Sequence, residues 1–261
     1  MDLMSRLQRI ASADPDVRRR ELLSMLDEMK APYSRYRDSA GKLEPENIVV
    51  SFSKEDEPRY VVGAHYDSAL GSTGANDNGA GVCILLEVVQ HYLLHPPSVP
   101  QDIMFFDLEE VGIGGSLGYL ERFGIEKISG MVNLDICGVG DTILAAPGMY
   151  AKEGYLRESL EKVAQSGQHK MQIVDRLPPG DDRVFEGRRI PTITACIVPQ
   201  ADVEPLLVLS KFIDERRGEP PTATPSIMET FHNASRDSIN VIETPAMEKM
   251  LAWTLDLMKA L

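Results

Sequence analysis

The segment 103–116 reads IMFFDLEEVGIGGS: a short apolar run, then two adjacent glutamates and a glycine-rich turn. The run 103–108 predicts a strand that is buried on both faces, because strands in the middle of a helix-covered sheet are apolar throughout. Residues 115–123 then predict a helix. A buried strand followed directly by a helix is the repeating unit of α/β proteins, so this segment indicates that fold class.

The same alternation continues on both sides of this segment. Asp14-Pro15 is a helix N-cap followed by proline, and it opens a predicted helix through residue 30. The runs 48–52 and 60–65, separated by the polar stretch 54–57, predict a β-hairpin. Further strands are predicted at 131–136, 142–146 and 190–198, helices at 76–94, 151–165, 203–216 and 244–261, and a loop at 218–226.

Strands and helices alternate along the whole chain, and no stretch reads as a linker. We therefore expect a three-layer α/β/α sandwich around a mostly parallel mixed central sheet. At 261 residues, one large domain is compatible with the length. The prediction is a single catalytic domain spanning residues 1–261.

Composition excludes several classes of function. The formal net charge is −13, which argues against nucleic acid and against anionic membrane surfaces as partners. No run approaches 18 apolar residues, and the first residues do not read as a signal peptide. The three cysteines, Cys83, Cys137 and Cys196, lie in apolar surroundings and predict reduced core thiols. We expect a cytoplasmic protein with no membrane association.

Histidine and carboxylate side chains concentrate where the predicted strands end. Ligands bind at the carboxyl ends of strands in open α/β sheets. Taken singly, each residue has an ordinary interpretation: His65 as a solvated histidine, Asp77 as a helix cap, His232 as a loop residue. Two adjacent glutamates after a buried strand, and an aspartate interrupting one, are harder to explain structurally. The candidates are His65, Asp67, Asp77, Glu109, Glu110, Asp135 and His232.

Together these residue types suit a pair of zinc ions. Zinc binds imidazole nitrogen and carboxylate oxygen at about 2.0–2.2 Å, and a catalytic zinc keeps one position open. Two ions about 3.5–4 Å apart share a bridging group. Co²⁺ or Mn²⁺ could occupy the same ligands. Asp67 follows His65 by two residues, a spacing that lets it accept a hydrogen bond from the far ring nitrogen.

Five motifs in fixed order resemble the co-catalytic dizinc aminopeptidases, a family related to glutaminyl cyclase and glutamate carboxypeptidase. The motifs are GAHYDS at 63–68, GANDNGAGV at 74–82, FFDLEEVGIGGS at 105–116, NLDICG at 133–138 and FHN at 231–233. The resemblance extends from about Val61 to the last predicted helix, which is most of the chain. The order of the motifs, rather than any single one, makes it specific.

The resemblance implies a role for each candidate. It places one metal on His65 and Asp135, a second on Glu110 and His232, and Asp77 as the bridge between them. It also implies that Glu109 is the general base, that Asp67 orients His65, and that the peptide bond between Asp77 and Asn78 is cis. Because neighbouring residues of an extended strand point to opposite sides, we expect Glu109 and Glu110 to do different work.

A further segment, 180–185, resembles the family's Ser-Asp-x-x-x-Phe loop near the substrate. It would place Asp181 and Phe185 at the substrate, although a solvated acidic turn is an equal interpretation of Asp181. The chain departs from the family in one respect near His232: an aspartate often stands four residues later, where this chain has Arg236, with Asp237 next.

The expected activity is that of a zinc aminopeptidase acting on peptides with a free N-terminus. A water activated by both metals and deprotonated by Glu109 would attack the scissile carbonyl. Two alternatives stay open: a glutaminyl-cyclase-like acyltransferase with one zinc, and a metal-free, non-catalytic homologue. Side-chain specificity and oligomeric state do not follow from the sequence.

Overall fold

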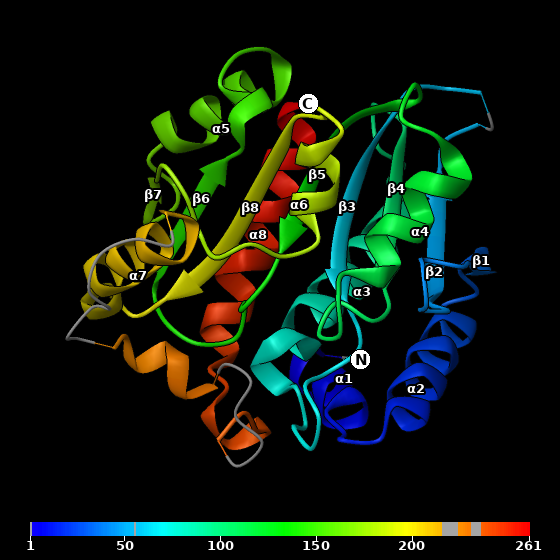
Figure 1. Ribbon diagram of the computed structural model, residues 1–261, viewed down its shortest axis with the longest axis horizontal. Helices are drawn as coiled ribbons and strands as arrows, with labels where there is room; N and C mark the ends of the chain where they lie inside the picture. The colour runs from blue at the N-terminus through cyan, green and yellow to red at the C-terminus, as the bar shows by residue number, and fades with distance from the viewer. Residues whose placement is uncertain (1, 55, 216–223, 231–235) are drawn as a thin grey trace.

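A computed structural model describes residues 2–54, 56–215, 224–230 and 236–261. Its centre is an eight-stranded mixed sheet with the strand order β1-β2-β4-β3-β5-β8-β6-β7 (Figure 1). The central strands β4, β3, β5 and β8 are parallel to one another, whereas β1, β2 and β6 pair antiparallel. The strands are β1 Tyr33–Arg37, β2 Glu46–Phe52, β3 Arg59–His65, β4 Gln101–Phe106, β5 Ile128–Leu134, β6 Thr142–Pro147, β7 Met171–Ile173 and β8 Thr192–Val198.

Helices cover both faces of the sheet. One core cluster joins the sheet to α1, α2, α3, α5 and α8, and two smaller clusters join it to α4 and α6 and to α7 on the opposite face. In Figure 1, α8 runs behind the central strands and α4 in front of them. The helices are α1 Leu3–Ile10, α2 Pro15–Glu28, α3 Ala80–Leu94, α4 Gly114–Phe123, α5 Tyr155–Gln165, α6 Asp182–Gly187, α7 Val203–Glu215 and α8 Thr244–Ala260.

This architecture confirms the expected three-layer α/β/α sandwich. Strand β4 is buried along its whole length, as its apolar sequence predicts for a strand covered on both faces. All three cysteines are free and buried, as expected. No helix in the described part of the chain is long and apolar enough to cross a membrane. That residues 1–261 form one catalytic domain stays a prediction.

The predicted hairpin between 48–52 and 60–65 is wrong. Strand β4 lies between β2 and β3 and pairs with both, antiparallel to β2 and parallel to β3. Side-chain packing fits this pairing, because Gly63 in β3 leaves the space that the ring of Phe106 in β4 fills. Strand β4 begins far along the chain from β2, so local sequence could not reveal that it separates the two.

The other predicted elements recur with changed ends. The predicted helix 76–94 is interrupted at its start by a π-helical turn, η1 Ala75–Gly79, in which Asp77 and Asn78 have non-helical backbone angles. The predicted strand 103–108 ends at Phe106, and Leu108 has a φ of 57°. Strands β1 and β7 and helix α1 were not predicted, and the segment expected as a loop near the substrate forms helix α6. Most of the loop predicted at 218–226 lies outside the described residues.

The strand order creates a switch point at β3. After β3 the chain passes through α3 to β4 on one side, then through α4 to β5 on the other side. Helices α3 and α4 lie on opposite faces of the sheet. A crevice at the carboxyl ends of such strands is the usual place for a ligand in an open α/β sheet. Three of the four motifs in the described residues span the carboxyl ends of strands at this crevice: GAHYDS after β3, FFDLEEVGIGGS after β4 and NLDICG after β5.

Candidate metal centre

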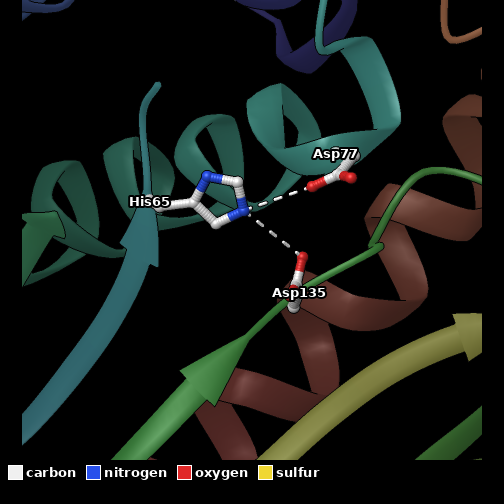
Figure 2. A group of neighbouring side chains, drawn as sticks. All are labelled: His65, Asp77 and Asp135. Carbon is white, nitrogen blue, oxygen red and sulfur yellow. Dashed lines mark ion pairs between the residues drawn. The ribbon is translucent and has the colours of Figure 1, made fainter. Parts of the chain in front are cut away.

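Three of the predicted ligands meet at this switch point. His65 ends β3, Asp135 follows the last residue of the neighbouring β5, and Asp77 lies in η1 (Figure 2). His65 Nε2 is 3.2 Å from Asp77 Oδ1 and 3.7 Å from Asp135 Oδ1. His65 and Asp77 are buried, and each of the three offers a ligand atom within 4.8 Å of the others.

These separations fit a metal ion. Two ligand atoms about 2.0–2.1 Å from a tetrahedral ion are about 3.3 Å apart, close to the spacing of Nε2 and the two carboxylate oxygens. His65 Nε2 and Asp135 Oδ1 are buried and make no well-formed hydrogen bond among the described residues. Buried polar atoms without such bonds are costly unless something compensates them. A cation between the three side chains would satisfy these atoms at once.

Asp67 lies on the far side of the His65 ring. Its Oδ1 is 3.3 Å from His65 Nδ1. The same carboxylate accepts hydrogen bonds from the backbone N–H groups of Glu109 and Glu110, each at 3.1 Å. Burial opposes ionisation, but contact with His65 and these two backbone bonds lower the pKa of Asp67. Asp67 thus joins the end of β3 to the turn that carries both glutamates.

Glu109 does not lie at an extended strand end, contrary to expectation. The left-handed backbone at Leu108 ends the strand, and the N–H groups of Gly112 and Ile113 both donate to the Glu109 carbonyl. Glu109 and Glu110 therefore sit in a turn, and strand alternation does not set their directions. Their different environments have to be read from their contacts instead.

The charge environment of Glu109 is strongly unfavourable to an anion. Burial raises its pKa to about 9; the charge of His65 opposes this rise, and the nearby Asp181, Asp135 and Asp77 add to it. Burial also lowers the pKa of His65, but the surrounding carboxylates outweigh it and raise that pKa well above 6.5. A bound cation changes such values in the opposite direction for carboxylates. The cluster carries more negative charge than its own residues neutralise.

The η1 turn that carries Asp77 is held by contacts that the sequence did not reveal. The Asp77–Asn78 peptide bond is cis, as predicted. Asp237 accepts hydrogen bonds from the backbone N–H groups of Asn76 at 2.7 Å and Asp77 at 3.3 Å. The Asn78 amide donates to the Leu134 carbonyl at 2.7 Å, which ties η1 to β5. Asp237 lies five residues after His232, and nothing in the sequence around it indicates this role.

The two predicted substrate residues have different surroundings. Asp181 is fully buried, neither of its carboxylate oxygens makes a well-formed hydrogen bond among the described residues, and burial raises its pKa to about 7. The adjacent Gly180 approaches Glu109 and Asp135 closely. Phe185, in contrast, is 0 % exposed and packs edge-on against Phe106 in the core. Its ring offers no surface to a substrate in this structure.

The second predicted metal position is only partly visible. Glu110 lies beside Glu109, and its charge acts on Asp135, but it is not part of the group formed by His65, Asp77 and Asp135. His232 lies outside the described residues. The roles assigned to Glu110 and His232 stay predictions.

A small apolar cavity opens beside Asp135. Its walls come from the end of β5, from β8, from α7 and from the segments around 177 and 227, and they are apolar apart from the Asp135 carboxylate, one hydroxyl and one thiol. The lining residues are Asp135, Ile136, Leu177, Pro178, Thr194, Cys196, Val198, Leu206, Ile227 and Met228.

Comparison with known proteins identifies the class. The sequence model of peptidase family M28 matches residues 47–258, so the protein is of a peptidase class. The chain belongs to peptidase family M28, and the resemblance drawn from the motifs is confirmed.

Two relatives illustrate the range of the family. A vacuolar membrane protease of Yarrowia lipolytica is 31% identical over 109 residues, which are 38% of this chain and 11% of that protein. Aminopeptidase YwaD of Bacillus subtilis is 30% identical over 131 residues, 48% of this chain and 28% of the enzyme. The matched parts thus span well under half of either relative. Neither name supports the expected cytoplasmic location.

Solved structures share the fold. The LapA aminopeptidase of Legionella pneumophila superposes with a TM-score of 0.70 at 17% identity, covering 99% of this chain and 70% of LapA. A glutaminyl cyclase from an Acidobacteriales bacterium also gives a TM-score of 0.70, at 16% identity, covering 98% of this chain and 91% of the cyclase. Both activities therefore occur on this fold, and the likeness itself does not choose between them.

Proposed function

We propose that this protein is a zinc aminopeptidase that removes the N-terminal residue of peptides. The observation that carries the proposal is the convergence of His65, Asp77 and Asp135 at the switch point of an M28 peptidase fold, with Glu109 buried beside them. The relative YwaD is named an aminopeptidase, which supports the same choice.

We further propose that two zinc ions bind. His65, Asp77 and Asp135 would hold the first, and Asp77, Glu110 and His232 the second. Zinc supplies polarisation of the scissile carbonyl and a lowered pKa for a bound water. Asp67 keeps Nδ1 of His65 protonated, which leaves Nε2 as the ligand atom. The buried surplus of carboxylates supports the proposal that more than one divalent cation binds.

Glu109 is the proposed general base. It accepts a proton from the attacking water as the new C–O bond forms at the carbonyl carbon. It then donates that proton to the leaving nitrogen as the C–N bond breaks. This work requires an ionised carboxylate at neutral pH, whereas burial and the neighbouring carboxylates raise the pKa of Glu109 to about 9 in the metal-free site. Ionisation of Glu109 therefore depends on positive charge in the site.

The site also indicates which end of a peptide binds. A buried cluster of carboxylates attracts the cationic amino group of a free N-terminus. The cavity beside Asp135 is largely apolar, so it suits an aliphatic side chain on the first residue. We propose that substrates with N-terminal leucine or methionine are cleaved faster than those with glutamate or lysine.

The test combines metal content with three assays on one preparation. Zinc per chain is measured first, followed by chromophore release from leucyl-, glutamyl- and lysyl-anilides, from N-acetyl-leucyl-anilide, and cyclisation of a peptide with N-terminal glutamine. We expect about two zinc ions per chain, fast release from leucyl-anilide and none from the acetylated form. Cyclisation without anilide release would establish the glutaminyl-cyclase alternative. Absence of bound zinc and of both activities would establish the metal-free alternative.

A further inference from the structure

A buried arginine from the N-terminal helices lies directly behind the candidate metal centre. Arg18 on α2 is 0 % exposed. Its Nε donates to the Tyr66 carbonyl at 2.5 Å, and its Nη1 donates to the Thr73 carbonyl at 2.6 Å and the Gly74 carbonyl at 3.2 Å. One guanidinium thus joins the backbone between His65 and Asp67 to the backbone that leads into η1.

The positive charge of Arg18 lies close to carboxylates of the candidate metal centre and its supporting loops. The carboxylates whose charges act on Arg18 are Asp67, Asp237 and Asp77. Removing a guanidinium from water is costly unless opposite charge and hydrogen bonds compensate it. Here these carboxylates and the carbonyl groups of the loops that carry them offset part of this cost, and burial still lowers the pKa of Arg18. Arginine suits this place because its planar group donates in several fixed directions, which an ammonium group cannot do.

Helix α1 completes this support. Leu7 and Ile10 of α1 lie against Gly79, the last residue of η1. Arg18 Nη1 also donates to the Ile10 carbonyl at 3.3 Å, which ties α2 to α1. Both helices precede residue 47, where the match to the M28 family model begins. The contact is therefore a feature of the part of this chain that the family model does not cover.

We propose that Arg18 is a positioning residue for the metal site. It fixes the β3–η1 connection so that Asp67 meets one nitrogen of His65 while Asp77 meets the other. This inference rests on the proposed metal-dependent function. Loss of the guanidinium would leave the ligands present but free to move relative to one another, so it would weaken metal binding beyond any general loss of stability.

Arg6 on α1 provides a matched control. It is 2 % exposed and also belongs to the N-terminal helices. Its side chain pairs with Glu87 at 2.7 Å and hydrogen-bonds Gln90. Both partners lie on α3 at least about two helical turns from η1, so among the described residues its printed side-chain contacts lie outside the site. The variants Arg18→Met and Arg6→Met each remove a buried charge from the same layer. Only the first removes contacts to the metal-site loops.

The experiment measures zinc affinity by competition with a chromogenic chelator, the absorption spectrum of the Co²⁺-loaded protein, and the thermal midpoint without metal. For Arg18→Met we expect zinc affinity to fall about 10–100-fold, the usual cost of losing a group that supports a ligand, with an altered cobalt spectrum. Arg6→Met should lower the thermal midpoint while zinc affinity and the cobalt spectrum stay as in the unmodified protein. Arg18→Lys should recover part of the affinity.

Two outcomes would overturn the inference. One is wild-type zinc affinity in Arg18→Met; the other is an equal loss of affinity in Arg6→Met. If Arg18→Met does not fold, Arg18→Lys is compared with Arg6→Lys on the same three measurements, and equal zinc affinities again overturn it. An unmodified protein that binds no zinc overturns the proposed function and this inference together. An unmodified protein that binds zinc, with the same affinity in Arg18→Met, overturns this inference alone, so the two failures are distinguishable.

Discussion

At the scale of single residues, the adjacent glutamates offer the sharpest test of mechanism. Glu109→Gln preserves size but cannot accept a proton. General base catalysis contributes about 10²–10⁴-fold to rate, so we expect kcat to fall by that order with zinc content unchanged. Glu110→Gln should instead reduce zinc content, and added zinc should restore part of the activity. Zinc content and kcat are measured for both variants side by side.

The two glutamate variants can also contradict the proposed mechanism. A Glu109→Gln protein with full activity excludes Glu109 as the base. Loss of zinc from Glu109→Gln but not from Glu110→Gln means that the two roles are exchanged. Both residues sit in one turn whose backbone is held by Asp67. A general distortion of that turn would change zinc content and kcat equally in the two variants, and equal losses therefore indicate distortion rather than separate roles.

The candidate metal ligands could be predicted because they lie in recognisable motifs, whereas the residues that hold those ligands in place could not. His65, Asp77 and Asp135 were proposed from motif order, and the structure brings them together. Arg18 and Asp237 support the same site, but they act on backbone groups of distant loops. A hydrogen bond to a carbonyl or an N–H group leaves no trace in the sequence of the partner. Such contacts become visible only when the fold is known.

At the scale of elements, the packing of η1 against α3 gives a second prediction. A methyl group at Gly81 would collide with the Asn78 side-chain amide, which is held by its bond to the Leu134 carbonyl. Gly81→Ala should therefore displace the turn that carries Asp77. Displacements of about 1 Å at a site can cost about 10²-fold in rate. We expect a loss of at least tenfold in kcat/KM, measured with leucyl-anilide, together with weaker zinc binding.

Gly187, the last residue of α6, is the control for that substitution. A methyl group there meets no atom within 4 Å. Gly187→Ala should leave kcat/KM and zinc affinity unchanged, with a slight gain in stability from the higher helix propensity of alanine. Wild-type activity in Gly81→Ala would show that η1 does not need its present position for catalysis.

Elements were predicted well where their own sequence determines them. The buried strand β4 and the helix opened by Asp14-Pro15 both follow from local pattern, and both are present. Strand pairing is not local, so the hairpin between β2 and β3 was wrong. Strand β1 escaped prediction because it is a half-exposed edge strand with polar side chains, and β7 is only 3 residues long. Apolar periodicity is weak in both.

At the scale of the whole molecule, pH should have opposite effects on the stability of the metal-free protein and on the extra stability that zinc provides. In the folded metal-free protein burial raises the pKa of Glu109 from 4.5 to about 9 and of Asp181 from 3.8 to about 7, and the carboxylates around His65 raise its pKa above 6.5. A raised folded-state pKa means that the folded protein binds more protons than the unfolded chain between the two values. Stability is therefore lost as pH rises through this window.

We accordingly expect the thermal midpoint of chelator-treated protein to fall between about pH 5 and about pH 9. Zinc requires deprotonated ligands, so protons compete with it at low pH, and the rise in midpoint caused by zinc should grow as pH increases. Midpoints are recorded at about pH 5, 7 and 9 with and without excess zinc. A metal-free midpoint that rises across this range, or a zinc effect that shrinks with pH, would mean that the buried carboxylate cluster is not what couples metal, protons and folding in this protein.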